Sequence, residues 1–184
     1  WSQRQAQEGG QGPRQGGRAV NRWRVELLGK GHLRAGFDCG VNDLNTFLER
    51  QAGQNARKDM SRTYVAVPED SRGVAGYYTL SSGSIRFENL PPDAAKRLPH
   101  YPIPTAHLWR LAVDVKFQGR GLGGVLLVNA LKRVRDIAND IGIHAVTVDA
   151  LDKNARSFYE AHGFRSLTDD VHHLYLPLAT IRQL

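Results

Sequence analysis

The sequence predicts one α+β domain built on a mixed, mostly antiparallel central sheet that is flanked by helices. Two observations lead to this fold class. The first half of the chain has short apolar segments separated by turn residues, which is typical of an antiparallel meander. The second half has a strand, a glycine-rich turn, a helix, a strand and a helix in succession. With 184 residues, the chain is long enough to bury one sizeable core.

The composition is that of an ordinary globular domain with a basic surplus. Hydrophobic residues make up 41% and charged residues 23% of the chain, and the formal net charge is +7. This charge favours a polyanionic ligand or partner, and a merely soluble basic protein is the alternative. No apolar run approaches the roughly 20 residues that cross a bilayer, so we expect no membrane partner. A single cysteine, Cys39, suits the reducing cytoplasm, where we expect the protein to act.

The N-terminal segment differs from the rest of the chain. Residues 1–20 are rich in Gly, Gln and Arg and have no hydrophobic periodicity, so we expect a flexible leader. They also have no apolar centre of the kind that a secretory signal needs. We expect one folded domain over residues 21–184, because no long linker or internal repeat interrupts this part.

Strand and turn signals begin soon after the leader. Residues 23–28 alternate as a first strand, and turn and capping residues at 38–43 precede a helix over 41–57. We expect two further strands at 63–67 and 74–82, joined by a turn as a hairpin.

The middle of the chain is punctuated by proline. Pro91 and Pro92 open a short predicted helix that runs to residue 98. We expect residues 99–104 to form an irregular connector, because prolines near both ends disfavour regular structure. An apolar strand over 108–115 follows.

The last third of the chain alternates between helix and strand. An amphipathic helix is predicted over 122–141, with Gly142 as the residue that ends it. A short buried strand at 145–148, a helix over 154–162 and a last strand at 174–178 complete the predicted elements.

The glycine-rich turn at residues 118–123, QGRGLG, is the most informative segment. It joins a strand to a helix N-terminus, where unpaired backbone N–H groups and the helix dipole favour phosphate. Glycines at 121 and 123 let a pyrophosphate approach the main chain. The segment also fits G-x-G-x-x-G, but too few residues follow for the second half of a dinucleotide-binding fold. A turn that only joins two elements is the structural alternative.

The same turn also fits [QR]-x-x-G-x-[GA], and there it resembles the acyl-CoA-binding loop of the GNAT superfamily of N-acetyltransferases. The resemblance extends in element order over nearly all of residues 23–178. It implies a GNAT fold in which a splayed parallel strand pair binds acyl-CoA, with acetyl-CoA as co-substrate. The donor-binding residues that it implies are Leu111, Ala112, Val113, Gln118, Gly119, Arg120, Gly121, Leu122, Gly123, Asn154 and Phe158.

Other motifs resemble one subgroup, the acetyltransferase toxins of bacterial toxin–antitoxin pairs. These motifs are Phe37-Asp38-Cys39-Gly40, Leu44, Phe47-Leu48, Gly76-Tyr77-Tyr78-Thr79-Leu80-Ser81, Arg110-Leu111-Ala112-Val113-Asp114, Val148-Asp149-Ala150 and Phe158-Tyr159-Glu160. The resemblance implies acetylation of the free α-amine of aminoacyl-tRNA, which stops translation. It also implies a homodimer and a ribbon-helix-helix antitoxin, through which alone the toxin reaches operator DNA. The alternatives are an N-acetyltransferase for a small amine or protein amine, and a binding domain that keeps only the CoA pocket.

Tyr159 is the candidate general acid. The resemblance places its hydroxyl beside the departing sulfur, and a phenol with a pKa of about 10 stays protonated at neutral pH. A core tyrosine packed with Phe158 and Phe164 is the structural alternative. The resemblance also implies the Val113 N–H as oxyanion donor. Asn154 is expected to contact the pantetheine arm, to cap its helix, or both.

Arg110 is the candidate substrate-binding residue, because it precedes the donor-binding strand segment and can pair with phosphate near the cleft. Its alternative is an ion pair with Asp114 or Glu88. No side chain is identified as a general base. The α-amine of an aminoacyl ester should have a pKa below about 7.7–8.0, so a substantial fraction is neutral without one. The histidines lack metal-ligand spacing, and we expect no metal site.

Overall fold

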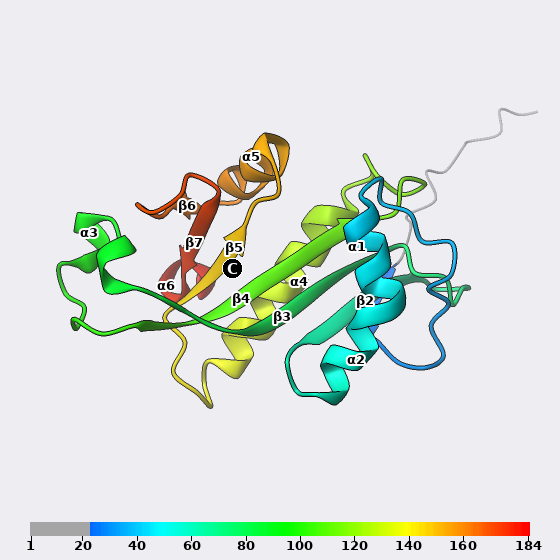
Figure 1. Cartoon of the computed structure of the whole chain (residues 1–184), viewed down its shortest axis with the longest axis horizontal. Helices are drawn as coiled ribbons and strands as arrows, with labels where there is room; N and C mark the ends of the chain where they lie inside the picture. Colours follow the sequence, from blue (N-terminus) through cyan, green and yellow to red (C-terminus); the bar gives the residue numbers. More distant parts are fainter. Residues whose placement is uncertain (1–22) are drawn as a thin grey trace, which may run out of the picture.

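The computed structural model describes residues 23–184, so the predicted leader lies outside the described residues. A seven-stranded sheet has the order β1-β2-β3-β4-β5-β7-β6 (Figure 1). All neighbouring strands are antiparallel except β4 and β5, so the predicted mixed sheet is confirmed. The strands are β1 Trp23–Leu27, β2 Arg62–Pro68, β3 Gly76–Ile85, β4 Ile103–Val113, β5 Ala145–Asp149, β6 Arg165–Ser166 and β7 His173–Pro177.

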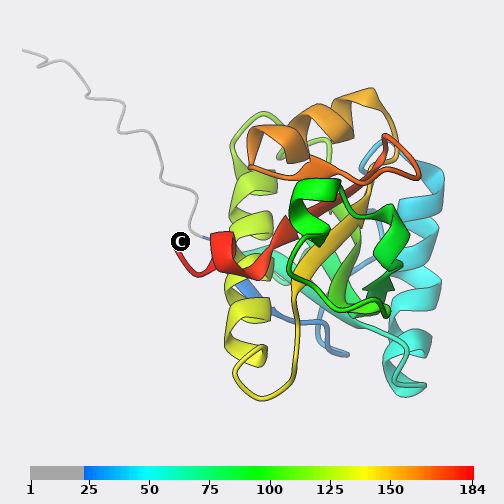
Figure 2. The ribbon, with the colours of Figure 1, turned by 90° about the vertical axis from the view of Figure 1, so that its left-hand side faces the viewer.

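Helices cover both faces of the sheet, with α4 on one side and the α1–α2 segment on the other (Figure 2). The helical elements are α1 Asn42–Thr46, the π-helix η1 Phe47–Gln51, α2 Ala52–Arg57, the 3-10 turn η2 Phe87–Asn89, α3 Pro92–Ala95, α4 Leu122–Ile137, α5 Lys153–Ala161 and α6 Leu178–Ile181. Within residues 23–184, no helix has the length and apolar character that crossing a bilayer requires.

Two adjacent tyrosines of β3 divide the core between the faces. Tyr78 belongs to the cluster under α4, whereas Tyr77 belongs to the cluster under η1, because neighbouring strand residues point to opposite sides. Each hydroxyl has a partner: Tyr78 donates to Asn129 Oδ1 at 2.7 Å and Tyr77 donates to the Leu44 carbonyl at 2.8 Å. Burial raises the pKa of Tyr78 to about 12. Both residues are therefore part of the scaffold.

Several predicted boundaries are wrong. The helix predicted over 122–141 ends at Ile137, where Ala138 is its C-cap, so Gly142 does not end it. Tight turns follow, and the apolar residue that had extended the periodicity, Ile141, is 59% exposed. The predicted connector over 99–104 is shorter, because β4 already begins at Ile103. Pro104 lies near the start of that strand, a position that strands tolerate.

β4 leaves its parallel neighbour halfway along its length. The two strands pair only from Thr105–Ala145 to Leu108–Val148, although β4 continues to Val113. Beyond Leu108, β4 and β5 diverge, with β5 leading toward α5 (Figure 1). The predicted splayed parallel pair is therefore confirmed, and residues 109–113 have no strand on their β5 side.

A β-bulge lies where the two strands separate. Across β3 and β4, Thr79 is opposite Arg110 but Leu80 is opposite Leu108. Trp109 is thus the extra residue on β4. A bulge increases the local bend and twist of a strand and re-aims its side chain. The bulge and the loss of pairing with β5 therefore coincide at one residue.

Candidate active site

The glycine-rich turn is held in place by a buried carboxylate. Asp114 is 3% exposed, and its two oxygens accept hydrogen bonds from the N–H groups of Asp38 at 3.1 Å and Lys116 at 2.9 Å. The Asp114 carbonyl accepts from the N–H groups of Phe117 and Gln118 at 2.8 and 3.1 Å. These bonds fix the start of the turn at the end of β4.

The rest of the turn presents unpaired amides. None of the N–H groups of residues 119–124 donates a hydrogen bond to a described residue. Gly119 and Gly121 have φ angles of 71° and 81°, a region that glycine adopts without strain, and Gly121 is the N-cap of α4. Residues 119 and 121–124 line a cavity of about 290 Å³ together with Val113, Phe117 and Phe158. The arrangement suits a pyrophosphate, whose oxygens accept such bonds.

Gln118 has a supporting position in this turn. Its side-chain amide donates to the Val113 carbonyl at 2.9 Å and to the Cys39 carbonyl at 3.2 Å. Its own N–H is already bonded to the Asp114 carbonyl, so it is not one of the free amides. Gln118 therefore links the turn to β4 and to the loop before α1.

At the open edge of β4, the backbone N–H of Val113 points in the direction that an oxyanion donor requires. The Asp114 N–H donates to the Ala75 carbonyl at 2.9 Å, on the β3 side. Because successive N–H groups of an extended strand point to opposite sides, the Val113 N–H points into the gap. The side chain of Ala112 packs in the η1 cluster and that of Leu111 against the α4 cluster. Their backbone thus remains at the edge of the gap.

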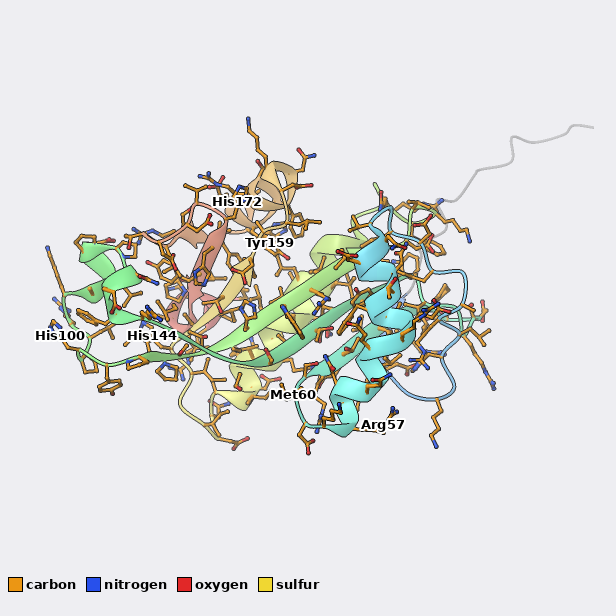
Figure 3. The ribbon with its side chains drawn as sticks, in the orientation of Figure 1. Arg57, Met60, His100, His144, Tyr159 and His172 are labelled. Carbon is orange, nitrogen blue, oxygen red and sulfur yellow. The ribbon has the colours of Figure 1, made fainter. Side chains whose placement is uncertain are left out.

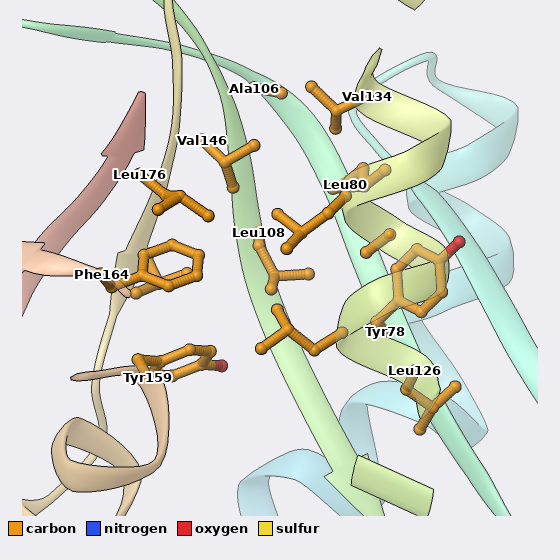
Figure 4. Close-up of a cluster of buried hydrophobic side chains, with 14 of the residues drawn as sticks. Tyr78, Leu80, Ala106, Leu108, Leu126, Val134, Val146, Tyr159, Phe164 and Leu176 are labelled. Carbon is orange, nitrogen blue, oxygen red and sulfur yellow. The ribbon is translucent and has the colours of Figure 1, made fainter. Parts of the chain in front are cut away.

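Tyr159 borders the same gap from α5. Its ring is 7% exposed and packs edge-on against Phe158 and Phe164, with centroid distances of 5.3 and 5.4 Å. Its hydroxyl points toward β4 (Figure 4), and no described residue hydrogen-bonds to it. Burial raises the pKa of Tyr159, so the phenol keeps its proton at neutral pH. The packed tyrosine and the candidate acid are therefore compatible.

Asn154 does not cap α5. The N-cap is Asp152, whose carboxylate accepts a hydrogen bond from the Ala155 N–H at 2.8 Å. Asn154 lies in the first turn of α5 and is exposed. The capping alternative is wrong because Asp152 already satisfies that amide, and the contact with the pantetheine arm stays a prediction.

Arg110 forms neither of the ion pairs that were its alternative. The described part of the chain has no salt bridge to its guanidinium, and Asp114 instead accepts from backbone amides. The guanidinium carbon lies 3.9 Å from the ring centre of Phe47 and 3.8 Å from that of Trp109. Burial lowers the pKa of Arg110, although a guanidinium stays charged at neutral pH.

A histidine–aspartate pair beside the gap was not predicted. His107 Nε2 lies 3.4 Å from Asp149 Oδ2, and its Nδ1 lies 2.9 Å from Thr147 Oγ1. His107 holds the pKa of the Asp149 carboxyl below its usual range. The pair forms because the parallel register brings residues 107 and 147 opposite each other. Only knowledge of that register could have revealed it.

We expect His107→Ala to raise the pKa of Asp149 toward its ordinary value of about 3.9. The pKa is lowered in the folded protein, so the pair stabilises the fold above the unfolded pKa. This contribution disappears as the pH falls through the folded pKa. A carboxyl ¹³C titration measures the shift. His100→Ala is the matched control, because His100 lies toward the α3 end (Figure 3). An unchanged Asp149 titration in His107→Ala would contradict the pairing.

The histidines of the structure are dispersed. His100 and His144 lie toward the α3 end of the molecule, whereas His172 lies on the α5 side in this view (Figure 3). Among residues 23–184, no three His, Cys, Asp or Glu side chains are grouped so that they could hold a metal ion.

Known proteins share this architecture. Residues 37–178 match the family model of the acetyltransferase (GNAT) domain. A probable toxin TacT from Sinorhizobium fredii is 35% identical over 161 residues, which cover 83% of this chain and 89% of the relative. A tRNA-acetylating toxin from Mycobacterium tuberculosis is 38% identical over 148 residues, covering 80% and 87%.

Solved structures of similar proteins have the same fold. A tyrosine-to-phenylalanine mutant of KacT has a TM-score of 0.84 and 31% identity, covering 88% of this chain and 98% of that one. AtaT complexed with acetyl-methionyl-tRNA has a TM-score of 0.83, with the same identity and the same two coverages. AtaTR bound with AcCoA has a TM-score of 0.77 and 31% identity, covering 88% and 96%. Other matches show AtaT bound to the C-terminus of the antitoxin AtaR, and a KacTA–DNA complex.

The predicted fold and the predicted resemblance to toxins of this class are therefore confirmed. The splayed strands, the free amides at the turn and the matched family model lead to one assignment. This chain belongs to the acetyltransferase (GNAT) family.

Proposed function

We propose that this protein transfers an acetyl group from acetyl-CoA to the free α-amine of aminoacyl-tRNA and so blocks translation. The observation that carries the proposal is the unpaired edge of β4, residues 109–113, which ends at six free amides. A donor with a pyrophosphate at one end and an acyl amide arm fits these two features. Similarity to AtaT, which has been solved with acetyl-methionyl-tRNA, supports the acceptor, as does the net charge of +7.

The donor site follows from the groups present. The free amides of residues 119–124 and the N-terminus of α4 would bind the pyrophosphate of acetyl-CoA. The open backbone of residues 111–113 would hydrogen-bond the amides of the pantetheine arm. The Val113 N–H would then stabilise the negative charge on the acetyl oxygen, because it points into the gap. Phe158 lines the same cavity.

Proton transfer is assigned to Tyr159. The neutral amine attacks the thioester carbonyl, the carbon–sulfur bond breaks, and the phenol gives its proton to the departing sulfur. The attacking nitrogen releases its proton to solvent, from which the phenolate is reprotonated. Burial favours the neutral phenol and so keeps the acid loaded before each turnover.

The partners follow from the same similarity. AtaT is known bound to the antitoxin AtaR, and KacTA is known in complex with DNA. We therefore assign to this chain an antitoxin as partner and operator DNA as a target reached through it. The ribbon-helix-helix form of the antitoxin, the homodimer, the cytoplasmic location and the division into leader and domain stay predictions.

Labelled acetyl-CoA incubated with total charged tRNA tests the function. We expect label in RNA that mild alkali releases as N-acetyl amino acid, because the acceptor is esterified to the tRNA. Deacylated tRNA is the control and should remain unlabelled. Transfer to polyamines or protein amines without any label in charged tRNA would overturn the proposal in favour of a small-amine or protein N-acetyltransferase.

A further inference from the structure

Phe47, Trp109 and Arg110 form an aromatic–guanidinium stack at the open edge of β4, outside the donor cavity. The guanidinium carbon of Arg110 packs against both Phe47 and Trp109, at 3.9 and 3.8 Å from their ring centres. The two rings are 5.9 Å apart at an interplanar angle of 68°. Phe47 is fully buried, whereas Trp109 is 42% exposed. The stack therefore has a buried base and an accessible outer ring.

The β-bulge explains how two neighbouring residues share this stack. In a regular strand, consecutive side chains point to opposite faces. Trp109 is the extra residue between the pairs Thr79–Arg110 and Leu80–Leu108, so its side chain can join that of Arg110 on the η1 face. The same bulge marks the place where β5 diverges. The stack thus lies where β4 loses its pairing with β5, beside the strand edge that is proposed to bind the donor.

The stack also holds a hydrogen-bond donor without a partner. Arg110 Nη1 is buried and bonds to no described residue, although two aromatic rings pack against the guanidinium. A buried N–H group without an acceptor destabilises a structure. Arg110 as a whole is only partly buried, so a ligand that brings an acceptor to its guanidinium would be favoured. The free part of the Trp109 ring next to it offers a flat apolar surface.

These two features select the chemistry of the ligand. An aliphatic side chain would cover Trp109 but leave the Arg110 N–H unpaired. A phosphate would pair with Arg110 but make no use of the indole. A nucleotide satisfies both, because its base has a π-face for stacking and its oxygen and nitrogen atoms accept hydrogen bonds. In the proposed function, a nucleotide adjoins the reacting amine at the 3′ end of the aminoacyl-tRNA.

We propose that Trp109 stacks on the 3′-terminal nucleobase of the aminoacyl-tRNA while Arg110 hydrogen-bonds to the same nucleotide. This inference rests on the proposed acceptor and adds a residue that positions it. Trp109 does not touch the reacting atoms, so its loss acts on acceptor binding and leaves donor binding unchanged.

Trp109→Leu tests the inference, because leucine keeps apolar bulk but has no aromatic face. We expect the KM for aminoacyl-tRNA to rise roughly 5- to 150-fold, the range for loss of one stacked base. The kcat/KM for the methyl ester of the same amino acid, which has no base, should stay unchanged, as should the Kd for CoA. Trp109→Phe should restore most of the affinity. Tyr101→Leu, at another exposed aromatic, is the matched control.

Each other result is decisive. An unchanged KM for tRNA in Trp109→Leu, or an equal loss with the methyl ester, would overturn the stacking role. A second measurement does not depend on catalysis: a CCA trinucleotide, added with CoA at saturation, should quench tryptophan fluorescence in the wild type but not in Trp109→Leu. Equal quenching in both proteins would overturn the inference. Quenching by CCA without any acetylation of charged tRNA would refute the proposed function alone.

Discussion

Tyr159→Phe is expected to lower kcat by about two to four orders of magnitude, the usual contribution of a positioned acid. Without the phenol, the thiolate must leave unprotonated or take its proton from water. The fold should be unchanged, because the hydroxyl has no partner among the described residues and the ring packing against Phe158 and Phe164 is retained. The release of free CoA thiol measures the rate, and calorimetry measures CoA binding.

Tyr175→Phe is the matched control for this variant. It also removes a hydroxyl without a partner, in this case a buried one that belongs to β7 and to the cluster near α3. Its activity should equal that of the wild type. A Tyr159→Phe protein that transfers acetyl groups at the wild-type rate would show that the sulfur is protonated by another group.

Gly121→Val is expected to weaken CoA binding by more than tenfold. The φ angle of 81° at this position is strained for any residue with a Cβ, by about 1–2 kcal/mol, and more so for a β-branched one. Nothing lies within 4 Å of the added Cβ, so the effect comes from the backbone and not from a clash. Relief of the strain rotates the turn, and the amides of residues 119–124 then no longer converge. Isothermal titration with CoA measures the loss.

Gly142→Val serves as the control for this second variant. An added Cβ there also meets nothing within 4 Å, but the φ angle of Gly142 is not in the left-handed region. Its CoA affinity should match that of the wild type. If both valine variants bind CoA equally well, the free amides of the turn do not form the donor site.

Local patterns in the sequence were sufficient to predict most of the secondary structure and the glycine-rich turn at 118–123. Apolar alternation and glycine or proline punctuation are local signals, so the antiparallel strands and the turn at 118–123 could be predicted. The end of α4 could not, because Ile141 continues the apolar period although the chain has already turned. The cap of α5 was also missed: Asn154 was the candidate, but Asp152, two residues earlier, accepts the hydrogen bond.

Features that depend on strand register were beyond local patterns. The bulge at Trp109 and the pair formed by His107 and Asp149 exist only because particular residues of β3, β4 and β5 face one another. A shift by one position would separate them, and no short segment encodes that alignment. The candidate acid Tyr159 was within reach because it belongs to a contiguous motif, whereas the aromatic stack on Arg110 combines residues from two distant elements.

The short stretch of pairing between β4 and β5 affects how rigidly the two halves of the sheet are joined. Main-chain bonds join the two halves of the sheet through four residue pairs, and apolar packing supplies the rest of the cohesion. A substrate that bonds to residues 109–113 takes the place of the missing part of a neighbouring strand. The sheet is then continuous only when the donor is bound. Amide protons of residues 109–113 should therefore exchange with solvent most slowly when the donor is present.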